Sequence, residues 1–153
     1  MIPAELTSRP QWLIWRYQER EGKSTKVPVD PKNGRSGRVD DPATWAAYDQ
    51  ACAATERFRC EGVGFVFTAD DPYVGIDLDH CRDSQTGKLE PQAQALIDAF
   101  ATYAESSVSG SGVHLILRGT MPRGSRHRGR LDGLEVEVYG QGRYFVTTGQ
   151  ELS

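Results

Sequence analysis

Apolar and polar residues alternate along residues 73–79, in the middle of the chain, as they do in a β-strand with one buried face. The apolar residues of this segment point to one side of such a strand, whereas Asp77 and Asp79 point to the other. Residues two apart on a strand are roughly 6–7 Å apart at Cα, so both carboxylates can reach one cation or bridge two ions about 3.5–4 Å apart. Without a cation the like charges repel, and the pKa of one carboxyl rises. The alternative is that Asp79 caps the turn at residues 80–83 and that Asp77 is a partly solvated acid.

Aromatic and branched apolar residues dominate several other segments, which are predicted as strands. They are residues 11–17, 26–29, 62–67, 113–118, 134–139 and 143–148. Pro28 restricts residues 26–29 to the edge of a sheet. The turn signal at residues 70–72 predicts a hairpin between the third of these segments and the acidic strand, and residues 140–142 predict a second hairpin between the last two.

Two segments carry apolar residues at helical spacing. Asp41 and Pro42 form an N-cap and a first-turn proline, and they predict a helix that continues to about Arg57. A second apolar stripe predicts a helix from Glu90 to about Glu105. Both stripes are interpreted as faces that pack against a sheet.

Length and composition limit the possible classes of protein. The 153 residues, 38% of them hydrophobic and 25% charged, are expected to form a single soluble domain. No apolar run has transmembrane length and no signal peptide is evident, so we expect a cytoplasmic location without membrane contact. The three cysteines have no Cys-x-x-Cys spacing and indicate neither a disulfide framework nor structural zinc. Because the net charge is −3, nucleic-acid binding would depend on a local basic patch.

A loop of small residues leads directly into the predicted strand at residues 113–118. Its last four residues are Ser109, Gly110, Ser111 and Gly112. Such a loop can direct N–H groups and hydroxyls toward a phosphate, although it can also be an ordinary flexible connection. His114 follows on the polar face of the strand, where it can donate a hydrogen bond to an anionic oxygen. A strand histidine can equally be a packed or solvent-facing residue.

The only dense basic segment of the chain is residues 122–130. Its four arginines are Arg123, Arg126, Arg128 and Arg130. The planar guanidinium suits phosphate recognition, so this segment indicates a contact with nucleic acid or a triphosphate, or else a solvated loop. Glu137 lies on the outward face of the next predicted strand, and the sequence leaves open whether Arg143 shares that face.

The order of these signals resembles the primase-polymerase (prim-pol) domains of phage and plasmid replication proteins, within the archaeo-eukaryotic primase superfamily. Residues 75–79 resemble the hydrophobic-Asp-x-Asp motif of that family. Residues 109–115 resemble its small-residue loop, which ends in a nucleotide-contacting histidine. Residues 136–139 and 142–149 resemble the strand with the third acid and the Arg-aromatic and Thr-Gly pattern that follows it. The resemblance covers nearly the whole chain.

The resemblance implies an α+β catalytic domain, with an RRM-like mixed or antiparallel sheet and packed helices, over residues 1–153. It implies that three acids bind two Mg²⁺ or Mn²⁺ ions and that a histidine holds the triphosphate, assisted by the small-residue loop. The acids are Asp77, Asp79 and Glu137, and the histidine is His114. Arg143, and more weakly Lys26, would help to neutralise the triphosphate.

The activity that the resemblance implies is template-directed nucleotidyl transfer from a dNTP or NTP to a DNA primer. A monomer is expected, without the C-terminal helical or helicase extension that such proteins often carry. Two features depart from the family: Glu137 stands where many members have Asp, and Gly112-Val113-His114 stands where Ser-x-His is common. The alternatives are a metal-dependent nuclease, although no Lys follows Glu137 at Glu-x-Lys spacing, and a non-catalytic DNA-binding module of a replication initiator.

Overall fold

The chain forms two compact units, and the computed structural model describes residues 1–153. The N-terminal unit consists of Ile2–Val66 and Tyr144–Thr147, and the C-terminal unit consists of Phe67–Arg143 and Thr148–Ser153 together with Met1. In chain order the elements are α1 (Ala4–Thr7), β1 (Trp12–Arg20), β2 (Lys23–Val29), the 3-10 helix η1 (Pro42–Thr44), α2 (Tyr48–Arg57), β3 (Gly62–Phe67), β4 (Tyr73–Asp79), α3 (Pro91–Phe100), β5 (Tyr103–Ser106), β6 (Val113–Arg118), β7 (Arg128–Leu131), β8 (Leu134–Tyr139) and β9 (Arg143–Thr147).

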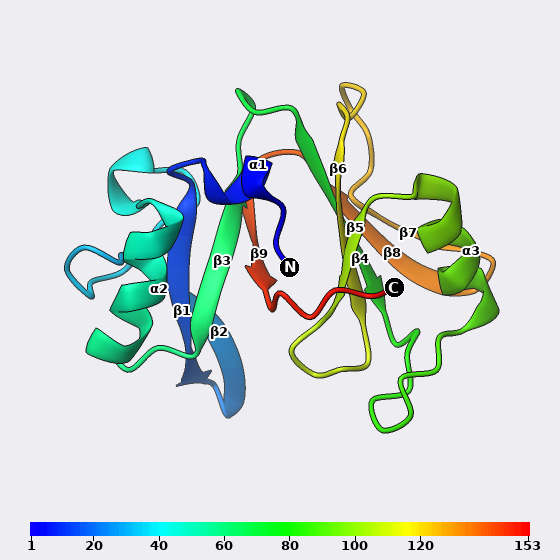
Figure 1. Ribbon diagram of the computed structural model, residues 1–153, viewed down its shortest axis with the longest axis horizontal. Helices are drawn as coiled ribbons and strands as arrows, with labels where there is room; N and C mark the ends of the chain where they lie inside the picture. Colours follow the sequence, from blue (N-terminus) through cyan, green and yellow to red (C-terminus); the bar gives the residue numbers. More distant parts are fainter. The chain divides into compact units, whose positions relative to one another are not determined.

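A four-stranded sheet with the order β2-β1-β3-β9 forms the centre of the N-terminal unit. β1 pairs antiparallel with β2 and β3, and the position of β2 at the edge confirms the prediction made from Pro28. The buried ring of Trp12 on β1 meets those of Tyr48 and Phe65 edge to face, at centroid distances of 4.8 and 5.3 Å. Because Tyr48 begins α2, this contact packs the helix against β1 (Figure 1).

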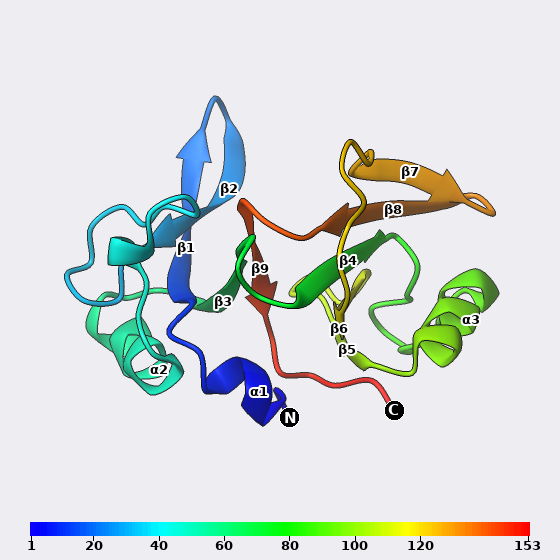
Figure 2. The same ribbon diagram turned by 90° about the horizontal axis from the view of Figure 1, so that it is seen from above.

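A five-stranded antiparallel sheet with the order β5-β6-β4-β8-β7 forms the C-terminal unit. The acidic strand β4 lies at its centre, and β7 and β8 run side by side at one edge (Figure 2). α3 covers one face, where Ala93 of the helix packs with Leu78 and Leu115 in a cluster of buried side chains. The opposite face carries the polar residues of the same strands. The fold is therefore α+β with antiparallel sheets, as predicted.

Both predicted hairpins are wrong. β3 belongs to the four-stranded sheet and β4 to the five-stranded sheet, and β9 and β8 are divided in the same way. The turn after β3 is stabilised by its own side chain, because Asp71 accepts hydrogen bonds from the N–H groups of Thr68 and Tyr73. A turn that is satisfied locally does not require its flanking strands to pair, and β4 instead gains two partners, β6 and β8.

Both predicted helices are shorter than expected. Asp41 caps only the 3-10 helix η1, by accepting a hydrogen bond from the N–H of Ala43 at 3.0 Å. Trp45 is extended and Ala46 forms a β-bridge with Trp12, so α2 cannot begin before Tyr48. The second helix ends because Ala101 adopts a left-handed conformation (φ 45°), and the chain then continues as strand β5 rather than as helix.

No helix in the structure combines the length and the apolar character needed to cross a bilayer. All three cysteines are free thiols. Cys81 is the buried one, and its burial raises the pKa of the thiol to about 11, which leaves it as the protonated form at neutral pH.

Candidate functional site

One residue from each strand of the five-stranded sheet belongs to a row that crosses the face opposite α3. In strand order, this transverse row consists of Glu105, His114, Asp77, Glu137 and Arg128. Each member lies directly opposite the next in the antiparallel register. Directly opposite residues have Cβ atoms about 4.5–5.5 Å apart, so the row brings together charged groups that are distant in the sequence.

Asp77 is at the centre of the row, on the central strand β4. Its Oδ1 lies 3.6 Å from Nε2 of His114, and its side chain is only 23% exposed. Burial raises the pKa of Asp77 above its ordinary value, and Asp79 and Glu137 raise it further. His114 and Arg143 act in the opposite direction. The raised pKa of Asp77 thus comes mainly from burial, and the like charges that the sequence analysis considered add to it.

Asp79 lies on the same face as Asp77, directly opposite Glu135, which confirms the predicted alternation. Glu135 accepts a hydrogen bond from Arg130 at 3.1 Å. The turn after β4 does not depend on Asp79, because the N–H groups of Cys81 and Arg82 both donate to the carbonyl of Ser111. This geometry argues against the alternative in which Asp79 serves as a turn cap.

Glu137 is held by two arginines. Arg128 places its Nε 2.8 Å from Oε1 of Glu137, and Arg143 places its Nη2 3.9 Å from Oε2. The guanidinium of Arg143 also lies 4.7 Å from the centroid of the Tyr139 ring. Arg143 therefore lies near Glu137, although β8 and β9 belong to different sheets and have no common register.

The basic segment contributes to this site only in part. Arg128 and Arg130 pair with Glu137 and Glu135, whereas Arg123 and Arg126 lie in the exposed connection before β7. Nucleic-acid binding by these four arginines stays a prediction. To bind a phosphate, Arg128 and Arg130 would first have to release their acidic partners.

The small-residue loop is held in place by hydrogen bonds within itself. The N–H of Gly110 donates to the carbonyl of Ser107, and the N–H of Gly112 donates to the hydroxyl of Ser107. The hydroxyls of Ser107, Ser109 and Ser111 form a chain with separations of 3.1 and 2.8 Å. The N–H groups of Gly110 and Gly112 are therefore already used, whereas the serine hydroxyls can rotate toward a ligand, and phosphate binding there stays a prediction.

The structure explains why glycine occupies position 112. A Cβ atom there would lie 2.9 Å from the carbonyl oxygen of Leu78 and 3.2 Å from the hydroxyl of Ser107. The backbone oxygen belongs to the buried strand β4 and cannot easily move. The loop therefore has no room for the serine that the Ser-x-His pattern would place here.

Gly112→Ser is accordingly expected to destabilise the protein, although it restores the common pattern. Overpacking of this kind costs about 1–3 kcal/mol in the free energy of unfolding. Urea unfolding of both proteins measures the difference. Gly129→Ser is the matched control, because a Cβ at that position meets nothing within 4 Å. A Gly112→Ser protein as stable as the control would contradict the steric argument.

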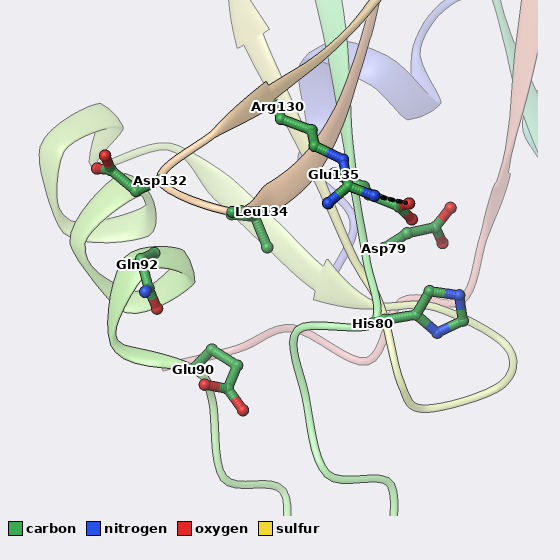
Figure 3. A pocket seen from close by; sticks show the side chains of 9 residues that line it. Asp79, His80, Glu90, Gln92, Arg130, Asp132, Leu134 and Glu135 are labelled. Carbon is green, nitrogen blue, oxygen red and sulfur yellow. Dashed lines mark hydrogen bonds and ion pairs between the residues drawn. The ribbon is translucent and has the colours of Figure 1, made fainter.

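An open pocket of about 470 Å³ adjoins the end of β4. Figure 3 shows Asp79, Glu90, Asp132 and Glu135 around it, with Arg130 bonded to Glu135. Four acids and a single arginine make its lining strongly negative. Such a lining repels an anionic group unless cations accompany it.

The donor set fits a hard divalent cation, because Asp77, Asp79 and Glu137 offer carboxylate oxygens from a single face. The His, Cys, Asp and Glu side chains nevertheless form no group of three or more that could hold an ion as they stand. Glu137 is engaged by Arg128 and would have to turn toward the two aspartates. Metal binding by the three acids stays a prediction that the chemistry of the donors supports.

The chain is 39% identical over 152 residues to the protein named "DNA Primase-polymerase" of Nitratiruptor phage NrS-1. The similarity confirms the resemblance to the prim-pol family. The match covers 97% of this chain but 21% of the length of the phage protein. No protein-family model matches the chain.

The structure adds one residue to the candidate site. The sequence analysis had assigned this residue to the end of a helix. Glu105 belongs to strand β5, is fully buried, and is the first member of the transverse row. A charged residue between Ala104 and two serines was the available signal, but it could be interpreted only after the strand was known. Lys26, in contrast, lies on β2 of the N-terminal unit, and a role for it in nucleotide binding stays a prediction.

Proposed function

We propose that this chain is the catalytic domain of a DNA primase-polymerase, which transfers nucleotides from dNTPs or NTPs to a primer 3′-hydroxyl on a DNA template. The observation that carries the proposal is the transverse row. It brings Asp77, His114 and Glu137, which come from three separate motifs, onto adjacent strands of one sheet. The similarity to a phage protein named as a DNA primase-polymerase supports the same conclusion.

The residues of the site have distinct roles in this proposal. Asp77, Asp79 and Glu137 would hold two Mg²⁺ or Mn²⁺ ions, which suit carboxylate oxygens. When bound, such ions acidify the attacking hydroxyl and stabilise the leaving pyrophosphate. His114 and Arg143 would bind and orient the triphosphate, and would offset its charge beside the acids. The hydroxyls of the small-residue loop would add donors to the same phosphates.

The substrates follow from this assignment: a primer–template DNA and a nucleoside triphosphate. Arg123 and Arg126, which are exposed, are the arginines of the basic segment best placed to contact the DNA backbone. A helicase domain or protein is a further partner that such a replication activity would use, and a cytoplasmic location fits it. An RRM-like primase core is the corresponding proposal for the fold.

A primer-extension assay tests the proposed function. A labelled primer annealed to its template is incubated with the protein and Mn²⁺, with and without dNTPs. We expect the primer to lengthen only when dNTPs are present. Asp79→Asn should abolish extension, whereas Asp98→Asn on α3, which also removes a carboxylate but on the covered side of the sheet, should not.

The same assay distinguishes the alternatives. Shortening of the primer, independent of dNTPs and lost in Asp79→Asn, would identify a metal-dependent nuclease in place of a polymerase. A protein that binds the primer–template but leaves the length of the primer unchanged would be a non-catalytic DNA-binding module.

A further inference from the structure

Glu105 is a fully buried carboxylate at the end of the transverse row. A buried charge is costly unless several donors surround it. Its Oε2 accepts hydrogen bonds from the hydroxyl of Tyr103 at 2.7 Å and from the N–H of Gly149 at 2.8 Å. Its Oε1 accepts one from the N–H of Thr148 at 2.9 Å. Every one of these groups belongs to the C-terminal unit.

The same Oε1 faces His114. Glu105 and His114 lie directly opposite each other on β5 and β6, and Oε1 is 3.6 Å from Nδ1 of the imidazole. The other ring nitrogen, Nε2, faces Asp77 at the same distance. The imidazole is therefore held between a buried carboxylate on one side and a partly exposed one on the other.

We infer that Glu105 is a positioning residue for His114. It fixes the plane of the ring and accepts the proton on Nδ1, so that Nε2 faces the triphosphate, and Nε2 donates its own proton to a phosphate oxygen when the triphosphate favours the doubly protonated ring. A carboxylate behind a functional histidine commonly sets its tautomer and orientation in this way. The separation of 3.6 Å exceeds a hydrogen-bond distance, so the inference requires this contact to shorten when substrate binds, as catalytic contacts often do.

A purely structural role for Glu105 would be to fasten the segment that follows β9. That segment has other attachments, however. The hydroxyl of Thr148 donates to the carbonyl of Ser106, the N–H of Ser106 donates to the carbonyl of Gln150, and the N–H of Leu152 donates to the carbonyl of Ala104. Because these bonds hold the segment without Glu105, fastening alone does not explain why a charge is buried opposite the histidine.

This inference rests on the proposed function, since it assigns His114 to the triphosphate. The experiment therefore has two readouts, of which only one requires activity. Glu105→Gln keeps the size of the side chain but removes its charge. Thr148→Ala is the control for fastening, because it removes the hydroxyl that bonds Ser106 and leaves the N–H that bonds Glu105.

The first readout is the KM for dNTP in primer extension. We expect Glu105→Gln to raise this KM about tenfold or more, the typical cost of losing a partner that orients a functional histidine. The affinity for primer–template should not change. Thr148→Ala should lower the melting temperature yet leave the KM for dNTP within about twofold of the wild type.

The second readout is the ¹⁵N NMR spectrum of the histidine rings, which contains only His80, His114 and His127. In the wild type we expect a proton on Nδ1 of His114, and in Glu105→Gln we expect the ring signals of that histidine alone to shift. If Glu105→Gln does not fold, the wild-type spectrum still decides, because a bare Nδ1 would overturn the inference.

The outcomes separate the two proposals. An unchanged KM in Glu105→Gln, or an equal rise of KM in Thr148→Ala, would overturn the role of Glu105 while leaving the polymerase intact. A wild-type protein that does not extend primers would overturn the proposed function, whereas the NMR spectra would still report whether Glu105 orients the ring.

Discussion

Asp77→Asn is expected to abolish primer extension and at the same time to make the protein more stable. The activity should fall about a thousandfold or more, since a ligand that helps an ion stabilise transition-state charge contributes several kcal/mol. The stability should rise because Asp77 is a largely buried acid whose pKa is raised by burial and, further, by Asp79 and Glu137. Asn has nearly the same shape and no charge. A gain of about 1 kcal/mol would raise Tm by about 2–4 °C.

The difference in stability between Asp77→Asn and the wild type should depend on pH, in a direction that follows from the pKa of Asp77. Burial raises the pKa of Asp77 in the folded protein above its unfolded value of 3.8. A carboxyl with a raised pKa contributes stability that is fully present below its unfolded pKa and is lost as the pH rises through its folded pKa. The advantage of Asp77→Asn over the wild type should therefore be small near pH 3 and should grow to a plateau above the folded pKa.

Thermal unfolding of the two proteins across that range, without and with Mn²⁺, is the measurement. Mn²⁺ should raise the Tm of the wild type, because an ion compensates the clustered acids, and should raise that of Asp77→Asn less. Asp98→Asn on α3 should follow the wild type in both respects. If Asp77→Asn is inactive but less stable than the wild type at neutral pH, the claim that Asp77 serves activity and lowers the stability of the fold is wrong.

The local pattern of the sequence predicts the faces of the strands but not their partners. Alternation around Asp77 and His114 places both on polar faces, and the register confirms this. The two predicted hairpins fail because adjacent strands enter different sheets. Turn residues report only that the chain reverses, whereas strand pairing depends on burial contributed by segments far away in the sequence.

Glu105 illustrates a different limit. In the sequence, Glu105 looks like the last polar residue of the helix predicted from Glu90. Only the left-handed conformation of Ala101 shows that the helix has ended and that a strand follows. Its importance depends on lying opposite His114 and on accepting hydrogen bonds from Thr148 and Gly149. Such contacts between segments distant in the sequence cannot be deduced from composition or spacing.

Leu115→Ala is expected to have the opposite effect to Asp77→Asn: it should lower the free energy of unfolding strongly and change the activity little. Leu115 neighbours His114 on β6 but is fully buried on the face covered by α3. Truncating a buried leucine to alanine removes apolar contacts and leaves a cavity, which costs about 2–5 kcal/mol. Since neighbouring residues on a strand point to opposite faces, the transverse row should keep its register.

Urea unfolding measures this loss, and the KM for dNTP, measured at a temperature where the variant is fully folded, should stay within about twofold of the wild type. Leu131→Ala is the control, because Leu131 is 48% exposed on β7 and its truncation should change the free energy of unfolding by less than about 0.5 kcal/mol. If a folded Leu115→Ala protein loses affinity for dNTP, the two faces of the sheet are coupled, and the site depends on core packing as well as on the row of charges. If it retains affinity while Asp77→Asn loses activity and gains stability, then one face of the sheet supplies the fold and the other the chemistry.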